Sequence, residues 1–252
     1  MSLQLEGKRA IVTGGSRGIG KVIARELARE GVDVVIAARG REALEATASE
    51  LSKETGRKIV AVTFDATSKD SADALIAHAI EALGGVDILV NAAALPGGLS
   101  AATSLGEIDD QLALEDINIK VLGYVRTSRA IAPHLVKQGW GRIINIGGLA
   151  LFKTGRPVAS LRNVGVAAVT KNLADELGPK GVNVVAVHPG ATRTERTDAA
   201  AAAKAAEGNT IGRIVESEEI AYLVAFLASP KSAAINGAAI AAGGGTPGTI
   251  NY

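Results

Sequence analysis

A cluster of glycines near the N-terminus has the composition of a phosphate-binding turn. The segment Thr13-Gly14-Gly15-Ser16-Arg17-Gly18-Ile19-Gly20 follows a β-branched run and leads directly into a helical pattern. Glycines let the backbone turn sharply and approach a pyrophosphate, and the N-terminus of the following helix offers free N–H groups and a partial positive charge. The segment therefore predicts dinucleotide binding, with a plain glycine-rich turn as the alternative.

Two arginines indicate which dinucleotide this turn would bind. The second strand of such a unit ends beside the adenosine ribose, about 20 residues after the glycines, where an NAD site carries Asp or Glu. In this chain the second strand leads into Ala37-Ala38-Arg39, and Arg17 lies inside the glycine turn. Two guanidinium groups without a carboxylate suit the 2′-phosphate of NADP(H), which an acid would repel. We therefore expect NADP(H) rather than NAD(H). Two solvated surface arginines are the alternative.

The elements that must position these residues alternate along the chain. Short β-branched runs are expected to form strands at residues 9–13, 33–37, 58–64, 86–91, 141–146, 182–187 and 238–242. Amphipathic, Ala-rich runs are expected to form helices near residues 18–30, 41–55, 68–83, 110–138, 158–178 and 217–229. Strands that are apolar at nearly every position are buried on both faces. The pattern predicts an α/β fold: a Rossmann-type, doubly wound parallel sheet of about seven strands in three layers. No Pro/Ser-rich linker interrupts it, so we expect one domain over residues 1–252.

The composition argues against several classes of function. The 252 residues carry 27 Lys and Arg against 26 Asp and Glu, and a formal net charge of +1 gives no broad cationic field for nucleic acid or a membrane surface. No segment approaches the roughly 18 apolar residues of a membrane helix, and the N-terminus lacks the pattern of a signal peptide. The absence of cysteine excludes disulfides, thiolate metal sites and a cysteine nucleophile, and no other metal-ligand spacing occurs. We expect a cytoplasmic protein without a metal.

Motifs along nearly the whole chain resemble those of the short-chain dehydrogenase/reductase family, whose members are NAD(P)-dependent Rossmann proteins, usually tetramers or dimers. They occur in the family's order. The matching segments are Thr13-Gly14-x-x-x-Gly18-Ile19-Gly20, Asp65, Asn91-Ala92-Ala93-Ala94, Asn118, Gly139-Trp140-Gly141-Arg142-Ile143-Ile144-Asn145-Ile146, His188-Pro189-Gly190-Ala191-Thr192-Arg193-Thr194, and Ile235-Asn236-Gly237 followed by Gly243-Gly244-Gly245. The family prefers Asn-Asn-Ala-Gly at 91–94, so Ala92 and Ala94 are departures from its pattern. Gly243 is a further departure, in the last of these segments.

The resemblance implies a cofactor site at the ends of the strands. In the family, the residue at Asp65 binds adenine, and the segment after strand six contacts nicotinamide and pyrophosphate. The cofactor-binding residues implied are Gly14, Ser16, Arg17, Gly18, Ile19, Gly20, Arg39, Asp65, Ala66, Asn91, Ala92, Ala93, Pro189, Gly190, Thr192 and Thr194. For the two threonines, loop capping is the alternative. The Ala-rich stretch 198–208 stands where the family places its substrate lid.

Most of the family's catalytic residues are missing from this chain. The chemistry normally uses a Ser that holds the substrate oxygen, a Tyr that exchanges its proton, a Lys four residues later that lowers the tyrosine pKa, and an Asn that orders a water. None of the 3 tyrosines is followed by Lys four residues later. Alignment places Gly148, Ala159 and Asn163 at the Ser, Tyr and Lys positions, which leaves Asn118 as the expected catalytic residue.

Several residues near this emptied site have both a chemical and a structural interpretation. Lys153, Arg156 and Arg162 can bind an anionic substrate or supply a proton, or they form a solvated charged face. His188 adjoins the Pro-Gly turn and can contact substrate or serve packing. Asn118 itself can satisfy or bend the local helix backbone. The sequence leaves these alternatives open.

Three classes of function remain. The first is an NADP(H)-dependent oxidoreductase of unknown substrate with a displaced proton donor. The second is a cofactor-binding subunit without turnover, and the third is a non-redox, lyase-type enzyme on the same scaffold. An intact cofactor loop beside an emptied proton relay favours retained cofactor binding.

The expected partners are a small-molecule substrate and further copies of the chain. The runs 110–138 and 158–178 are apolar beyond one narrow stripe, and the family pairs these helices across a two-fold axis. We therefore expect a homo-oligomer, a dimer or a tetramer, and no binding of nucleic acid or membrane.

Overall fold

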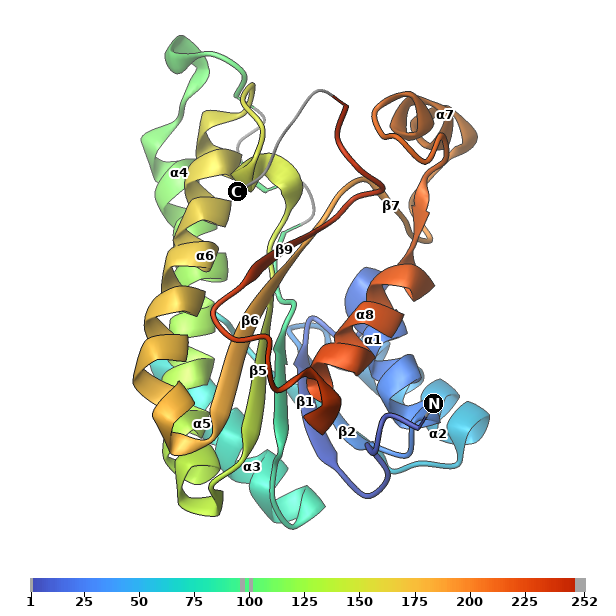
Figure 1. The fold of residues 1–252 in the computed structure, drawn as a ribbon, viewed down its shortest axis with the longest axis vertical. Coiled ribbons are helices and arrows are strands. Elements are labelled where there is room, and N and C mark those ends of the chain that lie inside the picture. The colour runs from blue at the N-terminus through green and yellow to red at the C-terminus, as the bar shows by residue number, and fades with distance from the viewer. Residues whose placement is uncertain (1, 96–97, 100–101, 248–252) are drawn as a thin grey trace.

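A parallel sheet of seven strands forms the centre of the molecule, in the order β3-β2-β1-β4-β5-β6-β9 (Figure 1). This computed structural model describes residues 2–95, 98–99 and 102–247. The strands are β1 (Arg9–Thr13), β2 (Asp33–Ala38), β3 (Ile59–Thr63), β4 (Ile88–Asn91), β5 (Gly141–Ile146), β6 (Val182–Pro189) and β9 (Ala239–Ala242). Every neighbouring pair in this sheet is parallel. The predicted fold class is confirmed.

Helices cover both faces of the sheet. They are α1 (Gly18–Arg29), α2 (Arg41–Thr55), α3 (Lys69–Leu83), α4 (Asp110–Ile117), α5 (Gly123–Gln138), α6 (Pro157–Leu177), α7 (Ala199–Glu207) and α8 (Ser217–Ala228). Among the described residues, none of these helices has the length and apolar character to cross a membrane.

Two hydrophobic cores, one on each face, explain why the strands are apolar at successive positions. Val34 and Ile36 of β2 pack with residues of α1, α2 and α8, whereas Val35 and Ala37 pack with residues of α3, α5 and α6. Successive side chains of a strand point to opposite faces, so a sheet covered on both sides buries every position. This arrangement gives the three layers that the sequence predicts.

The long helix expected over residues 110–138 is interrupted. A π-helical turn over Asn118–Leu122 separates α4 from α5. A π turn inserts an extra residue into the helix and shifts the direction of the side chains around it. This shift changes which residue of the segment faces the carboxyl ends of the strands.

A two-stranded ribbon lies outside the expected elements. β7 (Thr192–Arg193) pairs in parallel with β8 (Val215–Glu216), and α7 lies between them in the sequence. The Asp198 side chain begins α7 by accepting a hydrogen bond from the Ala201 amide at 2.7 Å. The Ala-rich stretch 198–208 therefore forms a short helix above the ribbon (Figure 1).

The strand order reverses beside β1. From β1 the chain proceeds to β2 and β3 on one side, whereas β4, β5 and β6 follow on the other side. In doubly wound sheets the loops that leave the two central strands diverge at this point, and a crevice opens at the carboxyl ends of the strands. The fold thus brings the loops after β1 and β4 to a position where a ligand site is expected.

Candidate functional site

A cavity of about 800 Å³ opens at the carboxyl ends of the strands. At its α1 end, which we define by Ser16, Arg17, Gly18 and Arg39, the walls come from the loops after β1 and β2. At its α6 end, which we define by Lys120, Gly148, Ala159 and Arg162, they come from the π turn, the loop after β5 and helix α6. The volume lies within the range of small-molecule and cofactor sites.

The glycine turn at the α1 end depends on two positions without a side chain. Gly14 has φ +72°, and a Cβ there would lie 2.7 Å from the carbonyl oxygen of Ala92. A Cβ on Gly20 would overlap the carbonyl oxygen of Gly14. The backbone can pack this closely only with glycine at both positions, which leaves the first turn of α1 open to the cavity.

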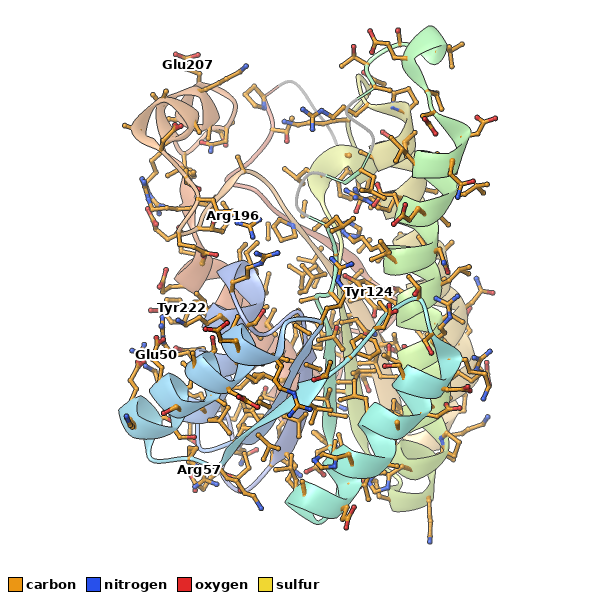
Figure 2. All side chains as sticks on the ribbon, turned by 180° about the vertical axis from the view of Figure 1, so that it is seen from behind. Glu50, Arg57, Tyr124, Arg196, Glu207 and Tyr222 are labelled. Carbon is orange, nitrogen blue, oxygen red and sulfur yellow. The ribbon has the colours of Figure 1, made fainter. Side chains whose placement is uncertain are left out.

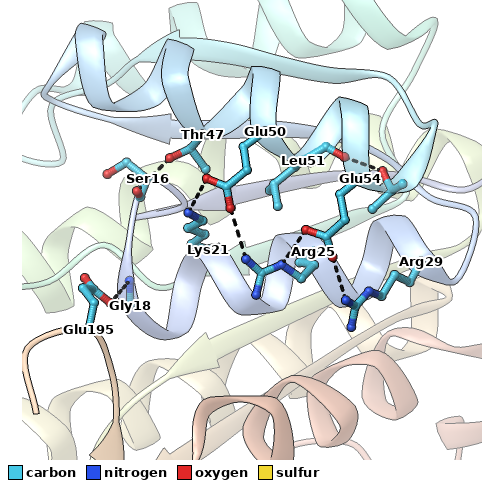
Figure 3. A network of polar contacts seen from close by, with 11 residues as sticks. Ser16, Gly18, Lys21, Arg25, Arg29, Thr47, Glu50, Leu51, Glu54 and Glu195 are labelled. Atoms are coloured by element: carbon cyan, nitrogen blue, oxygen red, sulfur yellow. Dashed lines mark hydrogen bonds and ion pairs between the residues drawn. The ribbon is translucent and has the colours of Figure 1, made fainter.

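The N-terminus of α1 already binds an anionic oxygen of the protein itself. The backbone N–H of Gly18 donates to Oε2 of Glu195 at 3.2 Å (Figure 3). The N-cap residue Arg17 makes no side-chain capping bond. A helix N-terminus with free N–H groups favours a negative group. The Glu195 carboxylate would have to leave this position before a pyrophosphate could bind there.

Arg17 and Arg39 both line the α1 end and are exposed. β2 ends at Ala38, so no carboxylate stands where an NAD-type site places one. Besides Glu195, the acid that lines this cavity is Asp65, which accepts hydrogen bonds from the amide and hydroxyl of Thr67 at 2.9 and 2.8 Å. These bonds hold the pKa of Asp65 below its usual value, with smaller contributions from Arg39 and Arg126.

Most of the residues predicted to bind the cofactor line this cavity. They are Gly14, Ser16, Arg17, Gly18, Ile19, Gly20, Arg39, Asp65, Ala66, Ala92, Ala93, Pro189, Gly190 and Thr194. The structure brings them to one surface, and their contacts with a cofactor stay predictions.

Two predicted cofactor residues lie outside the lining and serve the scaffold. Asn91 is fully buried; its Nδ2 donates to Oδ1 of Asn145 at 2.9 Å, and its Oδ1 accepts from Thr127 at 2.7 Å. It therefore ties β4 to β5 and α5. The hydroxyl of Thr192 donates to the carbonyl oxygen of Gly190 at 3.1 Å, which corresponds to the loop-stabilising alternative.

Asn118, the expected catalytic residue, also lies outside the lining. Its Oδ1 accepts a hydrogen bond from Nη2 of Arg126 at 2.6 Å, and its carbonyl oxygen accepts from Nη1 at 3.0 Å. These contacts do not test a catalytic role. Lys120, two residues later in the π turn, lines the cavity instead.

Lys120 is the functional candidate that the sequence analysis missed. Its side chain is buried, and Nζ donates to Gly147 O at 2.9 Å and to Oδ1 of Asn163 at 3.2 Å. Burial lowers its pKa to about 7, and the charge of Arg162 adds to this effect, while Asp116 opposes it. The four-residue spacing of Lys120 from Asp116 was the one signal in the sequence, although the π turn departs from the regular period on which such spacing is judged.

The three residues that the sequence analysis expects at the family's Ser, Tyr and Lys positions meet beside Lys120. Gly148 and Ala159 line the cavity, and Asn163 lies buried next to them with Nδ2 donating to Ala159 O at 2.8 Å. A Cβ on Gly148 would lie 3.3 Å from Nδ2 of Asn163. The α6 end therefore holds an ammonium against Asn163, but this ammonium is supplied by the π turn and not by α6.

His188 and Tyr124 pack behind the cavity. Nδ1 of His188 lies 3.2 Å from the amide nitrogen and 3.1 Å from the carbonyl oxygen of Gly148, and burial lowers the pKa of this ring to about 4. The Tyr124 hydroxyl donates to Ile146 O at 2.9 Å, and burial raises its pKa. Figure 2 shows Tyr124 between the helices and the sheet. Both groups are neutral near pH 7 and position the loop after β5.

Of the three basic residues singled out in the sequence, Arg156 and Arg162 line the cavity and Lys153 does not. Arg162 is buried and forms an ion pair with Asp116, in which Nη1 donates to both carboxylate oxygens at 2.8 and 2.9 Å. The last of the 3 tyrosines in the sequence, Tyr252, lies outside the described residues. Those described include no group of three or more His, Cys, Asp or Glu side chains arranged to bind a metal ion.

Comparisons with known proteins match this architecture. The family model for short chain dehydrogenases matches residues 8–205. The chain is 35% identical to the 3-oxoacyl-[acyl-carrier-protein] reductase FabG of Pseudomonas aeruginosa, over 96% of this chain and 98% of that protein. It is 33% identical to the short-chain reductase protein NovJ of Streptomyces niveus, over 94% and 93% of the two chains.

Solved structures are similar over the whole fold. L-sorbose reductase from Gluconobacter frateurii, complexed with NADPH and L-sorbose, superposes with a TM-score of 0.90 at 26% identity, covering 99% of this chain and 100% of that one. A short chain dehydrogenase from Burkholderia cenocepacia in complex with NADP superposes with a TM-score of 0.85 at 33% identity, covering 96% and 98%. With the family model matched over most of its length, the chain belongs to the short chain dehydrogenase family.

Proposed function

We propose that the protein is a cytoplasmic NADP(H)-dependent oxidoreductase that interconverts a carbonyl and an alcohol on a small molecule. In this proposal Gly148, Ala159 and Asn163 replace the family's Ser, Tyr and Lys, and Lys120 supplies the proton. One observation carries it: a single cavity has two arginines and a helix N-terminus at its α1 end and a buried lysine at its α6 end.

The α1 end has the groups that NADP(H) requires. Arg17 and Arg39 supply two guanidinium groups for the 2′-phosphate, and the first turn of α1 supplies backbone N–H groups for the pyrophosphate. The two solved relatives that hold NADPH or NADP support this assignment. When bound, the cofactor supplies the hydride, so the chain itself must orient the substrate and deliver a proton.

Lys120 has the position and the proton affinity for that task. Lys120 lines the cavity together with Gly148 and Ala159, and two neutral acceptors, Gly147 O and Oδ1 of Asn163, hold its Nζ in place. A pKa of about 7 means that the group can both carry a proton and release it near neutral pH. An ammonium at this position also stabilises the negative charge that develops on a carbonyl oxygen as hydride arrives.

The cofactor preference can be reversed at Arg39. Arg39→Asp removes one phosphate contact and adds a repulsive charge, so NADP(H) affinity should fall by on the order of 1.5 to 3 kcal/mol, a tenfold or greater change in Kd. Fluorescence titration with NADPH and NADH measures both constants. Arg41→Asp is the matched control, because Arg41 is exposed nearby but does not line this cavity. Equal affinity of the unmodified protein for both cofactors would end the assignment.

Glu195 should compete with the cofactor for the N-terminus of α1. Glu195→Gln removes the charge that now accepts from Gly18 N–H, so NADPH should bind several-fold more tightly, and its affinity should fall more steeply as ionic strength rises, because a repulsion that salt screens is gone. Calorimetric titration at two salt concentrations measures this change. Glu207→Gln, on exposed α7, provides the control. Weaker binding by the Glu195 variant would contradict the competition.

The role of Lys120 predicts a specific pattern of loss and rescue. Lys120→Asn should reduce NADPH-dependent turnover on a panel of ketones and oxo acids by about 10² or more, because the proton donor is lost. Adding Gly148→Ser, Ala159→Tyr and Asn163→Lys to this variant rebuilds the family's usual set and should restore turnover. The same three changes with Lys120 retained should fail, because two ammonium groups would then meet where Lys120 now contacts Asn163.

Controls separate this proposal from its alternatives. Lys153→Met should leave turnover unchanged, because Lys153 lies on the surface and outside the cavity lining. Tight NADPH binding without turnover by the unmodified protein would instead favour a non-catalytic cofactor-binding subunit. Full turnover by Lys120→Asn would remove Lys120 from the mechanism.

The expected oligomer is part of the proposal. Leu114 and Leu122, at α4 and the π turn, are 63% and 44% exposed, and Leu161 and Val164 of α6 are 59% and 47% exposed. Packing these side chains against a second copy of the chain would remove apolar surface from water. Light scattering should give two or four times the 25.5 kDa of one chain, and Leu161→Glu should shift the mass toward that of one chain. A mass of one chain at micromolar concentration would contradict this.

A further inference from the structure

The α6 end of the cavity carries more positive than negative charge. Lys120, Arg156 and Arg162 line it, and the one carboxylate in contact with them among the described residues is that of Asp116. The two acids that line the cavity, Asp65 and Glu195, follow β3 and β7 and serve the α1 end. Cations buried with too few anions destabilise one another, which indicates a place for a negatively charged ligand.

The guanidinium group of Arg162 makes only part of the hydrogen bonds that it could donate to the described residues. All of its hydrogen bonds to described residues run through Nη1 to Asp116, and Nε has no hydrogen-bond partner among those residues. Its side chain is only 7% exposed, so water replaces few of these bonds. Leaving a buried guanidinium N–H unpaired is costly, and a planar guanidinium matches a carboxylate well.

Lys120 adds a second cation next to Arg162. The groups that face it are Asp116 on its own helix, Arg162 and Asn163 on α6, Tyr124 in the following turn, and His188 behind Gly148. Of these, Tyr124 and His188 are neutral near pH 7, and Asp116 is paired with Arg162. Once that pair is formed, the positive charge of Lys120 has no counterion among the described residues.

We propose that the α6 end is a subsite for the carboxylate of an oxo acid, held by Arg162 with Arg156 at the rim, so that the carbonyl oxygen lies toward Lys120. This inference rests on the proposed function and names its substrate class. A monoanion fits because Asp116 already neutralises Arg162, which leaves one buried positive charge and one at the rim. In a 2- or 3-oxo acid the carboxylate and the carbonyl are close enough for adjacent cations to hold both.

Binding of such an acid should be linked to proton uptake. An adjacent carboxylate favours the charged form of Lys120 and raises its pKa above the value of about 7 in the free protein. Above pH 7 the free lysine is partly deprotonated, so the protein takes up a proton when the acid binds. The affinity for the acid therefore falls as pH rises from about 7 toward the pKa of the bound state.

Calorimetry of the NADP⁺-saturated protein tests this without turnover. Pyruvate and acetoacetate are titrated at pH 8 in two buffers of different ionisation enthalpy, alongside their methyl esters and inorganic phosphate. Both acids, or one of them, should bind at least tenfold more tightly than the esters and than phosphate, with uptake of a fraction of a proton. Lys120→Met should abolish the proton uptake, and Arg156→Met should weaken acid binding several-fold. Lys153→Met, on the same loop but outside the lining, should change neither.

Arg162 requires a paired substitution, because Arg162→Gln alone leaves Asp116 buried without its partner. Asp116→Asn with Arg162→Gln removes both charges, keeps similar volumes, and should eliminate the preference for acids over esters. Equal binding of acids and esters, phosphate as tight as the acids, or acid binding without proton uptake would each overturn the inference. Failure of the protein to bind NADP⁺ in the same samples would instead count against the proposed function.

Discussion

The buried contact between Lys120 and Asn163 links the main features of the α6 end. An ammonium is expensive to bury, and among the residues that the structure describes, two neutral acceptors and a carboxylate already paired with Arg162 compensate it. The contact depends on the π turn, which directs Lys120 toward the strand ends, and on Asn163, whose amide reaches the ammonium from α6. It also leaves no room for a second ammonium at position 163.

The two ends of the cavity are supported in different ways. The α1 end is built from backbone: glycines at 14 and 20 allow close packing, and the helix N-terminus provides the binding groups. The α6 end is built from side chains on two helices whose spacing is fixed by the core between them. In the proposed function, the cofactor-binding groups and the proton-delivering side chain therefore stand on different elements, so that one set can change without the other.

What the sequence could predict follows the same division. The strands, most helix boundaries and the glycine turn depend on local patterns of apolar residues and glycine, and they agree with the structure to within about two residues. The buried position of Asn91 could not be predicted in this way, since its hydrogen bond with Asn145 joins strands far apart in the sequence, and its expected contact with a cofactor stays a prediction. Lys120 was missed because the π turn breaks the regular 3.6-residue period on which facing residues are judged. The ion pair of Arg162 with Asp116 is likewise a contact across 46 residues.

A crystal structure of the protein with NADPH is the most direct test of this account. It should show the 2′-phosphate between Arg17 and Arg39, the pyrophosphate at the first turn of α1 with Glu195 moved away from Gly18, and the nicotinamide beside Lys120 at the α6 end. A 2′-phosphate that contacts neither arginine, or a nicotinamide that lies away from Lys120, would contradict it.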